Sequence, residues 1–198
     1  MPFKDIKNIL FDTSFLLKDS KDIDDIIKIL QRDHISCFIS NTVQTELDNL
    51  FYVDRLSKEQ YNIAMLRIKK AKAVNIEKNR NYLKDSITKE CTTSMNSEHG
   101  VESNDIRNDC SILTVALYNH IDLILSEDFH FTSRYTENVV DTISANTCNR
   151  FHKLCESDIL LLDKDSFLAA YQGKKVDLEI VDSMKQNIKK DSKSLKKE

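Results

Sequence analysis

The sequence has few of the residues that interrupt regular structure. Its 198 residues include two glycines and one proline, and tryptophan is absent. So few turn-forming residues exclude a collagen-like chain, a Gly/Pro-rich chain and an all-β sandwich with many turns. No apolar run approaches the roughly 18 residues of a membrane-spanning helix, and no signal peptide opens the chain. We therefore expect a cytoplasmic protein with no membrane partner.

Charge of one sign and paired cysteines are also lacking. The 29 basic and 32 acidic residues give a net charge of -3, which excludes a uniformly basic nucleic-acid coat. Hydrophobic residues make up 40% of the chain and charged residues 31%, which indicates a buried core under a well-solvated surface. The five cysteines are odd in number and contain no C-x-x-C pair. They are therefore expected to be buried, reduced thiols.

Short apolar runs alternate with helical patterns along the chain. Apolar runs predict strands, and periodic spacing with capping residues predicts helices. Because the two alternate, the sequence predicts a three-layer α/β/α sandwich with a mostly parallel sheet. The predicted strands are 7–11, 35–40, 122–126 and 158–162, and the predicted helices are 22–31, 41–53, 56–87, 105–120, 137–154, 166–171 and 177–188.

The stretch between the second and third strands is much longer than a normal crossover. It predicts a helical insertion at about 55–103, within a single domain that covers residues 1–184. The polar part of this stretch, 90–104, has few apolar anchors and is predicted to be a loop. The Lys-rich tail at 185–198 is expected to be disordered.

Four acidic residues map to one edge of the predicted sheet. Asp12 ends the first strand, and Asp128 follows the third. Glu46 and Asp109 lie in the early turns of the helices after the second strand and before the third. Ligand sites of open α/β sheets lie along the carboxyl edge of the strands, so these side chains are expected to meet there. Asp105 lies one helical turn before Asp109 and is an accessory candidate.

A cluster of carboxylates needs protons or a cation. Two like charges ~4 Å apart repel by about 4 kcal/mol at an effective dielectric constant near 20. An all-oxygen ligand set favours Mg²⁺ or Mn²⁺ over zinc, and such ions suit phosphodiester hydrolysis. The hydroxyl groups of Thr13, Ser14 and Ser126 could orient ligands or phosphate. At any single position the alternative is a helix cap or a solvated surface carboxylate.

Four segments resemble the PIN domain family of metal-dependent ribonucleases. They are Phe-Asp-Thr-Ser-Phe-Leu at 11–16, Ser-Asn-Thr-Val-Gln-Thr-Glu-Leu at 40–47, Asn-Asp-Cys-Ser-Ile-Leu-Thr-Val-Ala at 108–116, and Asp-Leu-Ile-Leu-Ser-Glu-Asp-Phe at 122–129. The resemblance implies a flavodoxin-like sandwich and a Mg²⁺- or Mn²⁺-dependent endoribonuclease, a hydrolase that leaves a 5′-phosphate.

The same resemblance assigns roles to individual residues. It implies that Asp12, Glu46, Asp109 and Asp128 are the catalytic, metal-binding carboxylates. Asp105 would be an accessory carboxylate, and Ser14 and Ser126 would be orienting hydroxyls. Ser126 stands where the family usually has Thr, and the chain is longer than the compact toxin ribonucleases.

RNA binding is predicted for a basic run. Residues 67–84 contain seven basic side chains against one acidic residue, Glu77, and we expect Arg67, Lys69, Lys70 and Lys72 to contact RNA. The alternative for such a run is a solvated helix face.

Other functions stay open at this point. The chain could be a catalytically inactive PIN-like module that binds RNA or acts as a scaffold. It could also be the toxin ribonuclease of a type II toxin–antitoxin pair with a protein antitoxin, or a homodimer by analogy. A response regulator would also cluster aspartates, and would need a lysine near a later strand, for which Lys164 is the candidate.

Overall fold

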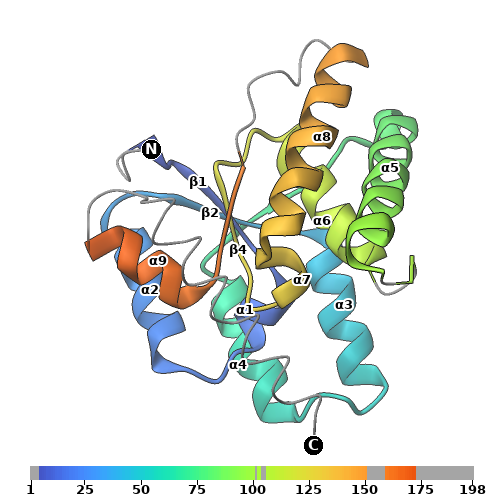
Figure 1. Ribbon diagram of the computed structural model, residues 1–198. Coiled ribbons are helices and arrows are strands. Elements are labelled where there is room, and N and C mark those ends of the chain that lie inside the picture. The colour runs from blue at the N-terminus through green and yellow to red at the C-terminus, as the bar shows by residue number, and fades with distance from the viewer. Residues whose placement is uncertain (1–4, 101, 104–105, 151–158, 173–198) are drawn as a thin grey trace, which may run out of the picture.

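A single sheet of five parallel strands forms the centre of the molecule, in the order β3-β2-β1-β4-β5 (Figure 1). The computed structural model describes residues 5–100, 102–103, 106–150 and 159–172. The predicted α/β class with a parallel sheet is confirmed. The strands are β1 (Asn8–Phe11), β2 (Ser36–Ser40), β3 (Lys72–Val74), β4 (Leu123–Leu125) and β5 (Leu160–Leu162).

Helices cover both faces of the sheet. In Figure 1, α2 and α9 lie to the left of the strands, and α5, α6 and α8 lie to the right, as a three-layer sandwich requires. The helices are α1 (Thr13–Leu17), α2 (Lys21–Arg32), α3 (Asn41–Tyr52), α4 (Lys58–Ile68), α5 (Asn81–His99), α6 (Arg107–Tyr118), α7 (Phe129–Thr132), α8 (Arg134–Arg150) and α9 (Lys164–Gln172), with a 3-10 turn η2 at Lys78–Arg80.

The central strands are apolar on both faces because helices cover both. Ile9, Leu10 and Phe11 of β1 are fully buried, and so are the three residues of β4. β1 pairs with β2 on one side and with β4 on the other, so Ile9 lies opposite both Cys37 and Leu123. Continuous apolar runs of this kind are typical of the inner strands of a parallel sheet.

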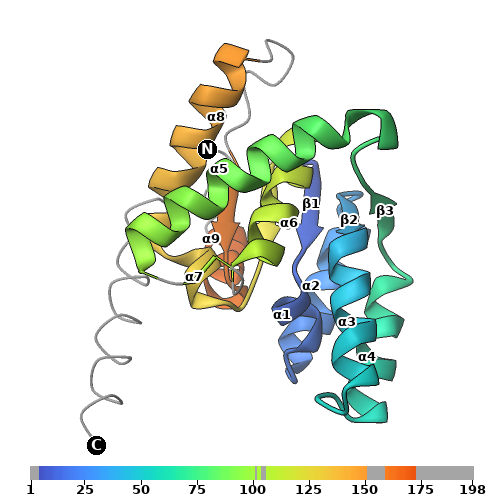
Figure 2. The same ribbon diagram turned by 90° about the vertical axis from the view of Figure 1, so that its right-hand side faces the viewer.

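The strand β3 was not predicted. The sequence predicts an unbroken helix over 56–87, but the helix α4 ends at Ile68 and β3 pairs with β2, with Val74 opposite Ser40. This strand is three residues long and two of them, Lys72 and Ala73, are exposed, so it lacks the apolar run that identifies a strand. Because β3 joins the sheet, the segment 55–103 forms part of the sandwich and is not simply appended to it (Figure 2).

The prediction of a loop at 90–104 is wrong for residues 90–99, which form the second half of α5. This helix buries one narrow stripe: Leu83, Ile87, Cys91 and Met95 recur every fourth residue and pack into the core. Its other positions are mostly polar, which made the segment look like a loop in the sequence. α5 ends at Gly100, whose φ of 66° is a left-handed conformation that glycine adopts without a steric cost.

The thiol prediction fails for three of the cysteines, since Cys91, Cys110 and Cys148 are disulfide-bonded. Cys91 of α5 and Cys110 of α6 form a disulfide, with their Cα atoms 5.5 Å apart. The two cysteines are 19 residues apart in the sequence and meet because α5 packs against α6. Their spacing in the sequence does not reveal this pairing. Cys37 is a free, buried thiol, as predicted, and burial raises its pKa to about 11.

Some predictions fall on residues that the structure does not describe. They are the helix at 177–188, the tail at 185–198 and the accessory carboxylate Asp105. Across the described ranges, none of the helices combines the length and the apolar character that crossing a membrane requires.

Candidate functional site

The candidate site lies where the strand order reverses. Chain order runs outward from β1 to β2 and β3 on one side, and from β4 to β5 on the other, so β1 and β4 flank the switch point. Open α/β sheets bind ligands in the crevice beyond the carboxyl ends of the strands at this point. Asp12 directly follows β1, and its backbone N–H donates to the Leu125 carbonyl of β4 at 3.0 Å. The sheet therefore brings the ends of these two strands together, as predicted.

Two serine hydroxyls hold the Asp12 carboxylate between β1 and β4. Asp12 is 3% exposed, and its Oδ2 accepts hydrogen bonds from Ser14 Oγ at 2.6 Å and from Ser126 Oγ at 2.8 Å. The backbone N–H groups of Glu127 and Asp128 donate in turn to the Ser14 and Ser126 hydroxyls, at 2.9 and 3.1 Å. Ser14 and Ser126 thus position the acidic side chain of Asp12, and their role in orienting a bound ligand or phosphate stays a prediction.

Two of the acidic residues are also helix caps. The Asp12 carboxylate accepts from the Ser14 N–H at the start of α1, and Asp128 Oδ1 accepts from the His130 N–H at 2.7 Å at the start of α7. A cap fixes the side chain against its own backbone. The capping alternative is therefore correct for both residues, and it adds to their presence at a shared rim rather than excluding it.

Glu46 reaches the rim from the neighbouring helix. α3 begins directly after β2, and its N-terminus is capped by Ser40, whose hydroxyl accepts from the Val43 N–H at 3.3 Å. Thr13 Oγ1 donates to Glu46 Oε2 at 2.6 Å, so α3 is tied to the residue that follows Asp12. This contact between Thr13 and Glu46, which are 33 residues apart, has no signal in the sequence.

The pKa of Asp109 responds to the charges of the other three carboxylates. Asp109 lies half-buried in the first turn of α6, and burial raises its pKa to about 9, helped by the charges of Asp12, Asp128 and Glu46. Burial also raises the pKa of Asp12, against the hydrogen bonds from its serines. The four predicted carboxylates are thus close enough to interact, and the ionised forms of Asp12 and Asp109 are disfavoured while no cation is bound.

The missing counter-charge fits a divalent cation. No lysine or arginine of the described part of the chain forms an ion pair with any of the four carboxylates. Within that same part, no three His, Cys, Asp or Glu side chains are already arranged as a metal site. Like charges repel, so the four side chains are expected to come closer together when a bound cation neutralises them. Their oxygen-only donor set suits Mg²⁺ or Mn²⁺.

The raised pKa of Asp109 predicts a stability effect. In the metal-free protein, a carboxyl with a raised folded-state pKa contributes stability that is fully present below its unfolded value of 3.8 and is lost as the pH rises to about 9. Asp109→Asn should therefore raise metal-free stability at neutral pH by about 2–4 kcal/mol, since each pKa unit corresponds to ~1.4 kcal/mol. Chemical denaturation in EDTA at a series of pH values measures this, and the gain should grow toward pH 9. A variant no more stable than the wild type at pH 8 would contradict the coupling.

Arg67 is not available to RNA. It is 3% exposed, and its guanidinium donates to the Leu16 and Lys18 carbonyls at 2.7 and 2.9 Å. We therefore remove it from the predicted RNA-binding set. Lys69, Lys70 and Lys72 lie exposed around the end of α4 and the start of β3, and they line no cavity at the carboxylate cluster.

Lys164 does not contribute to the cluster either. It begins α9, and its ammonium group pairs with Asp165 at 2.6 Å and with Asp22 at 3.7 Å. A response-regulator site would need this lysine beside the clustered aspartates, so the arrangement does not favour that alternative.

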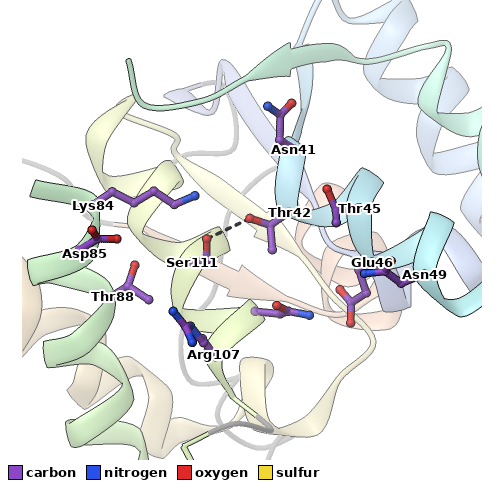
Figure 3. Close-up of a pocket in the computed structure, with 11 residues that line it drawn as sticks. Asn41, Thr42, Thr45, Glu46, Asn49, Lys84, Asp85, Thr88, Arg107 and Ser111 are labelled. Atoms are coloured by element: carbon purple, nitrogen blue, oxygen red, sulfur yellow. Dashed lines mark hydrogen bonds between the residues drawn. The ribbon is translucent and has the colours of Figure 1, made fainter. Parts of the chain in front are cut away.

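A polar cavity of about 330 Å³ lies beside Glu46 (Figure 3). It is bounded by α3, α5 and α6, and its lining residues were not identified from the sequence as a group. Part of the signal was present, since Lys84 belongs to the basic run and Arg107 and Asn108 directly precede Asp109. The lining residues are Asn41, Thr42, Thr45, Glu46, Asn49, Lys84, Asp85, Thr88, Arg107, Asn108 and Ser111.

Comparison with known proteins adds no identity to this geometry. No protein-family model matches the chain, and no curated protein matches it. The function is therefore argued from the chain's own side chains.

Proposed function

We propose that this protein is a divalent-metal-dependent endoribonuclease with a PIN-like active site. The observation that carries the proposal is geometric. Hydrogen bonds join the residues around Asp12, Glu46 and Asp128 at the switch point of a parallel sheet, and Asp109 lies near enough for its pKa to respond to all three. A buried acidic cluster without a basic partner is costly. A bound cation offsets this cost, and the cation can in turn bind a phosphate group.

In this proposal the four carboxylates bind the metal, and the neighbouring hydroxyl groups hold two of the carboxylates in position. Asp12, Glu46, Asp109 and Asp128 would hold Mg²⁺ or Mn²⁺, which when bound supplies charge for the phosphate oxygens and lowers the pKa of an attacking water. Ser14 and Ser126 donate to Oδ2 of Asp12, which fixes the orientation of its carboxylate. Thr13 fixes one oxygen of Glu46 in the same way.

The overall reaction is a hydrolysis. Water adds to phosphorus, the bond to the 3′-oxygen breaks, and that oxygen leaves with a proton as a 3′-hydroxyl. The products therefore carry a 5′-phosphate. The inactive-module alternative gives no reason for four coupled carboxylates to share a rim, and for that reason we favour the enzyme.

The direct test is cleavage of RNA by the purified protein. Single-stranded RNA should be cut with millimolar Mn²⁺ and should stay intact in EDTA, and the product ends should be substrates for a 5′-phosphate-dependent exonuclease. Asp128→Asn should lower the rate by about 100-fold or more, because even an outer-shell partner of a metal is worth ~10–100-fold. Asparagine can still cap α7, so the fold should be kept.

The matched control is Asp141→Asn, an exposed residue of α8, which should leave the rate unchanged. Cleavage that persists in EDTA, or products ending in a 2′,3′-cyclic phosphate, would rule the proposal out. A cyclic phosphate forms when the 2′-hydroxyl attacks in place of water.

A further inference from the structure

Two cavities meet at Glu46 and form one trough along α3. The first is the 330 Å³ cavity between α3, α5 and α6. The second, of about 550 Å³, lies toward the end of α3 and includes Arg55. Both are lined by Glu46, Asn49 and Asn108, so they adjoin at the residue that also belongs to the carboxylate cluster. We call this combined space the α3 trough.

Three cations from different elements line the α3 trough. Lys84 comes from α5 and Arg107 from α6, both in the first cavity, and Arg55 follows α3 in the second. None of them pairs with a carboxylate of the described residues. Figure 3 shows Lys84 extending from α5 toward α3, with Arg107 on the same side and Glu46 opposite. The trough therefore offers positive charge at separate points along its length.

The remaining lining is mostly uncharged and polar. Thr42 of α3 and Ser111 of α6 share a hydrogen bond of 2.9 Å across the first cavity, which ties the two helices together (Figure 3). Asn41, Asn49 and Asn108 present side-chain amides. An amide carries both a donor and an acceptor, which is what the edge of a nucleobase requires of a partner.

We propose that the α3 trough binds single-stranded RNA beside the carboxylate cluster, with Lys84, Arg107 and Arg55 on successive phosphates and the asparagine amides on base edges. This inference rests on the proposed function. Spaced cations suit a polymeric anion better than a small one. The cavity volumes lie at the lower end of the ~300–1,000 Å³ range of ligand pockets. We expect a single strand, and not an A-form duplex, to occupy them.

The trough replaces the expected RNA contacts of Lys69, Lys70 and Lys72 with Lys84, at the end of the basic run, and with Arg107 and Arg55. Lys69, Lys70 and Lys72 line neither cavity, whereas Lys84 and Arg107 share a cavity with Glu46. A strand lying along α3 would pass Glu46, the member of the carboxylate cluster that lines both cavities.

The test is RNA binding measured without hydrolysis. Fluorescence anisotropy of a labelled single-stranded RNA is recorded in EDTA with the full chain, over a range of salt concentrations. The double variant Lys84→Ala/Arg107→Ala should raise Kd about 10-fold. It should also reduce the slope of log affinity against log salt by about 1.4, since each phosphate contact contributes ~0.7 on a single strand.

The matched control removes two exposed lysines outside the trough, as Lys58→Ala/Lys69→Ala, and should change neither Kd nor slope. Asn49→Ala should alter the preference among the four homopolymeric RNAs while leaving the slope intact. Equal losses in both double variants would overturn the proposal, as would no loss in either or tighter binding of a duplex of the same sequence.

The two proposals can fail separately. RNA binding that depends on Lys84 and Arg107, without Mn²⁺-dependent cleavage, would reject the nuclease and keep the trough. Cleavage that needs Asp128, with binding indifferent to Lys84 and Arg107, would reject the trough alone. Thermal melting of each variant shows that it is folded before its binding is compared.

Discussion

Asp12→Asn is expected to abolish Mn²⁺-dependent RNA cleavage, with a loss of about 10³-fold, in a protein that remains folded. Asp12 is the most buried of the four carboxylates, and its position is fixed by Ser14 and Ser126 on both sides of the switch point. Losing an outer-shell partner of a metal already costs ~10–100-fold, so losing a ligand should cost more. Asparagine keeps the shape and the capping ability of aspartate, so α1 can still form.

A binding measurement separates this loss from general damage. In the wild type, Mn²⁺ should raise the melting temperature, because an ion that binds only the folded state stabilises it by mass action. Asp12→Asn should remove that rise together with the activity, whereas Asp141→Asn should change neither. A variant that still responds to Mn²⁺ as the wild type does would show that Asp12 is not a ligand.

The second large effect is expected at Arg67. Its guanidinium donates to the carbonyls of Leu16, Lys18 and Ser20, and it pairs with Asp24 at 3.1 Å. Arg67→Ala would remove these donors. The buried Leu16 carbonyl would lose its contact with the guanidinium, whereas the Lys18 and Ser20 carbonyls would keep the backbone N–H groups of Ser20 and Ile23. Asp24 is 42% exposed and can be solvated, so the loss comes mainly from the hydrogen bonds of the buried guanidinium and should be about 2–4 kcal/mol, since a hydrogen bond of a charged group contributes ~1.5–3 kcal/mol. In a chain of this size that corresponds to a fall of roughly 10 °C in melting temperature.

The comparison for Arg67 is Lys69→Ala, an exposed neighbour whose loss should cost less than about 0.5 kcal/mol. The hydrogen bond and charge of Arg67 also hold the pKa of Asp24 below its usual value. That part of the stability is present above pH 3.8 and is lost as the pH falls through the lowered pKa. An Arg67→Ala protein with wild-type stability would mean that water satisfies the carbonyls.

The carboxylate cluster was within reach of the sequence because it depends on strand ends. β1 and β4 are short, continuous apolar runs, each followed closely by an aspartate. In a parallel sheet the carboxyl ends of the strands share one edge, so Asp12 and Asp128 could be placed together without coordinates. Whether the cluster binds a cation stays a prediction.

The burial of Arg67 and the strand β3 could not be predicted from the sequence in this way. Arg67 was counted with the basic run, although it shares the buried face of α4 with Ala64 and Ile68. Its spacing in the helix was a signal for burial, but only the fold reveals the carbonyls of the α1–α2 connection that it faces. β3 exists because an edge strand can be short and half exposed when its neighbour β2 supplies the pairing. The Cys91–Cys110 disulfide likewise depends on tertiary packing.

The outer edge of the sheet at β3 has a consequence for association. A bare strand edge presents unpaired backbone groups that can recruit a strand of another molecule, and natural proteins discourage this with short strands and lysine. β3 is three residues long, with Lys72 exposed at its start. We therefore interpret Lys72 as a guard against intermolecular β-pairing, a role in which a positive charge is useful without any nucleic acid.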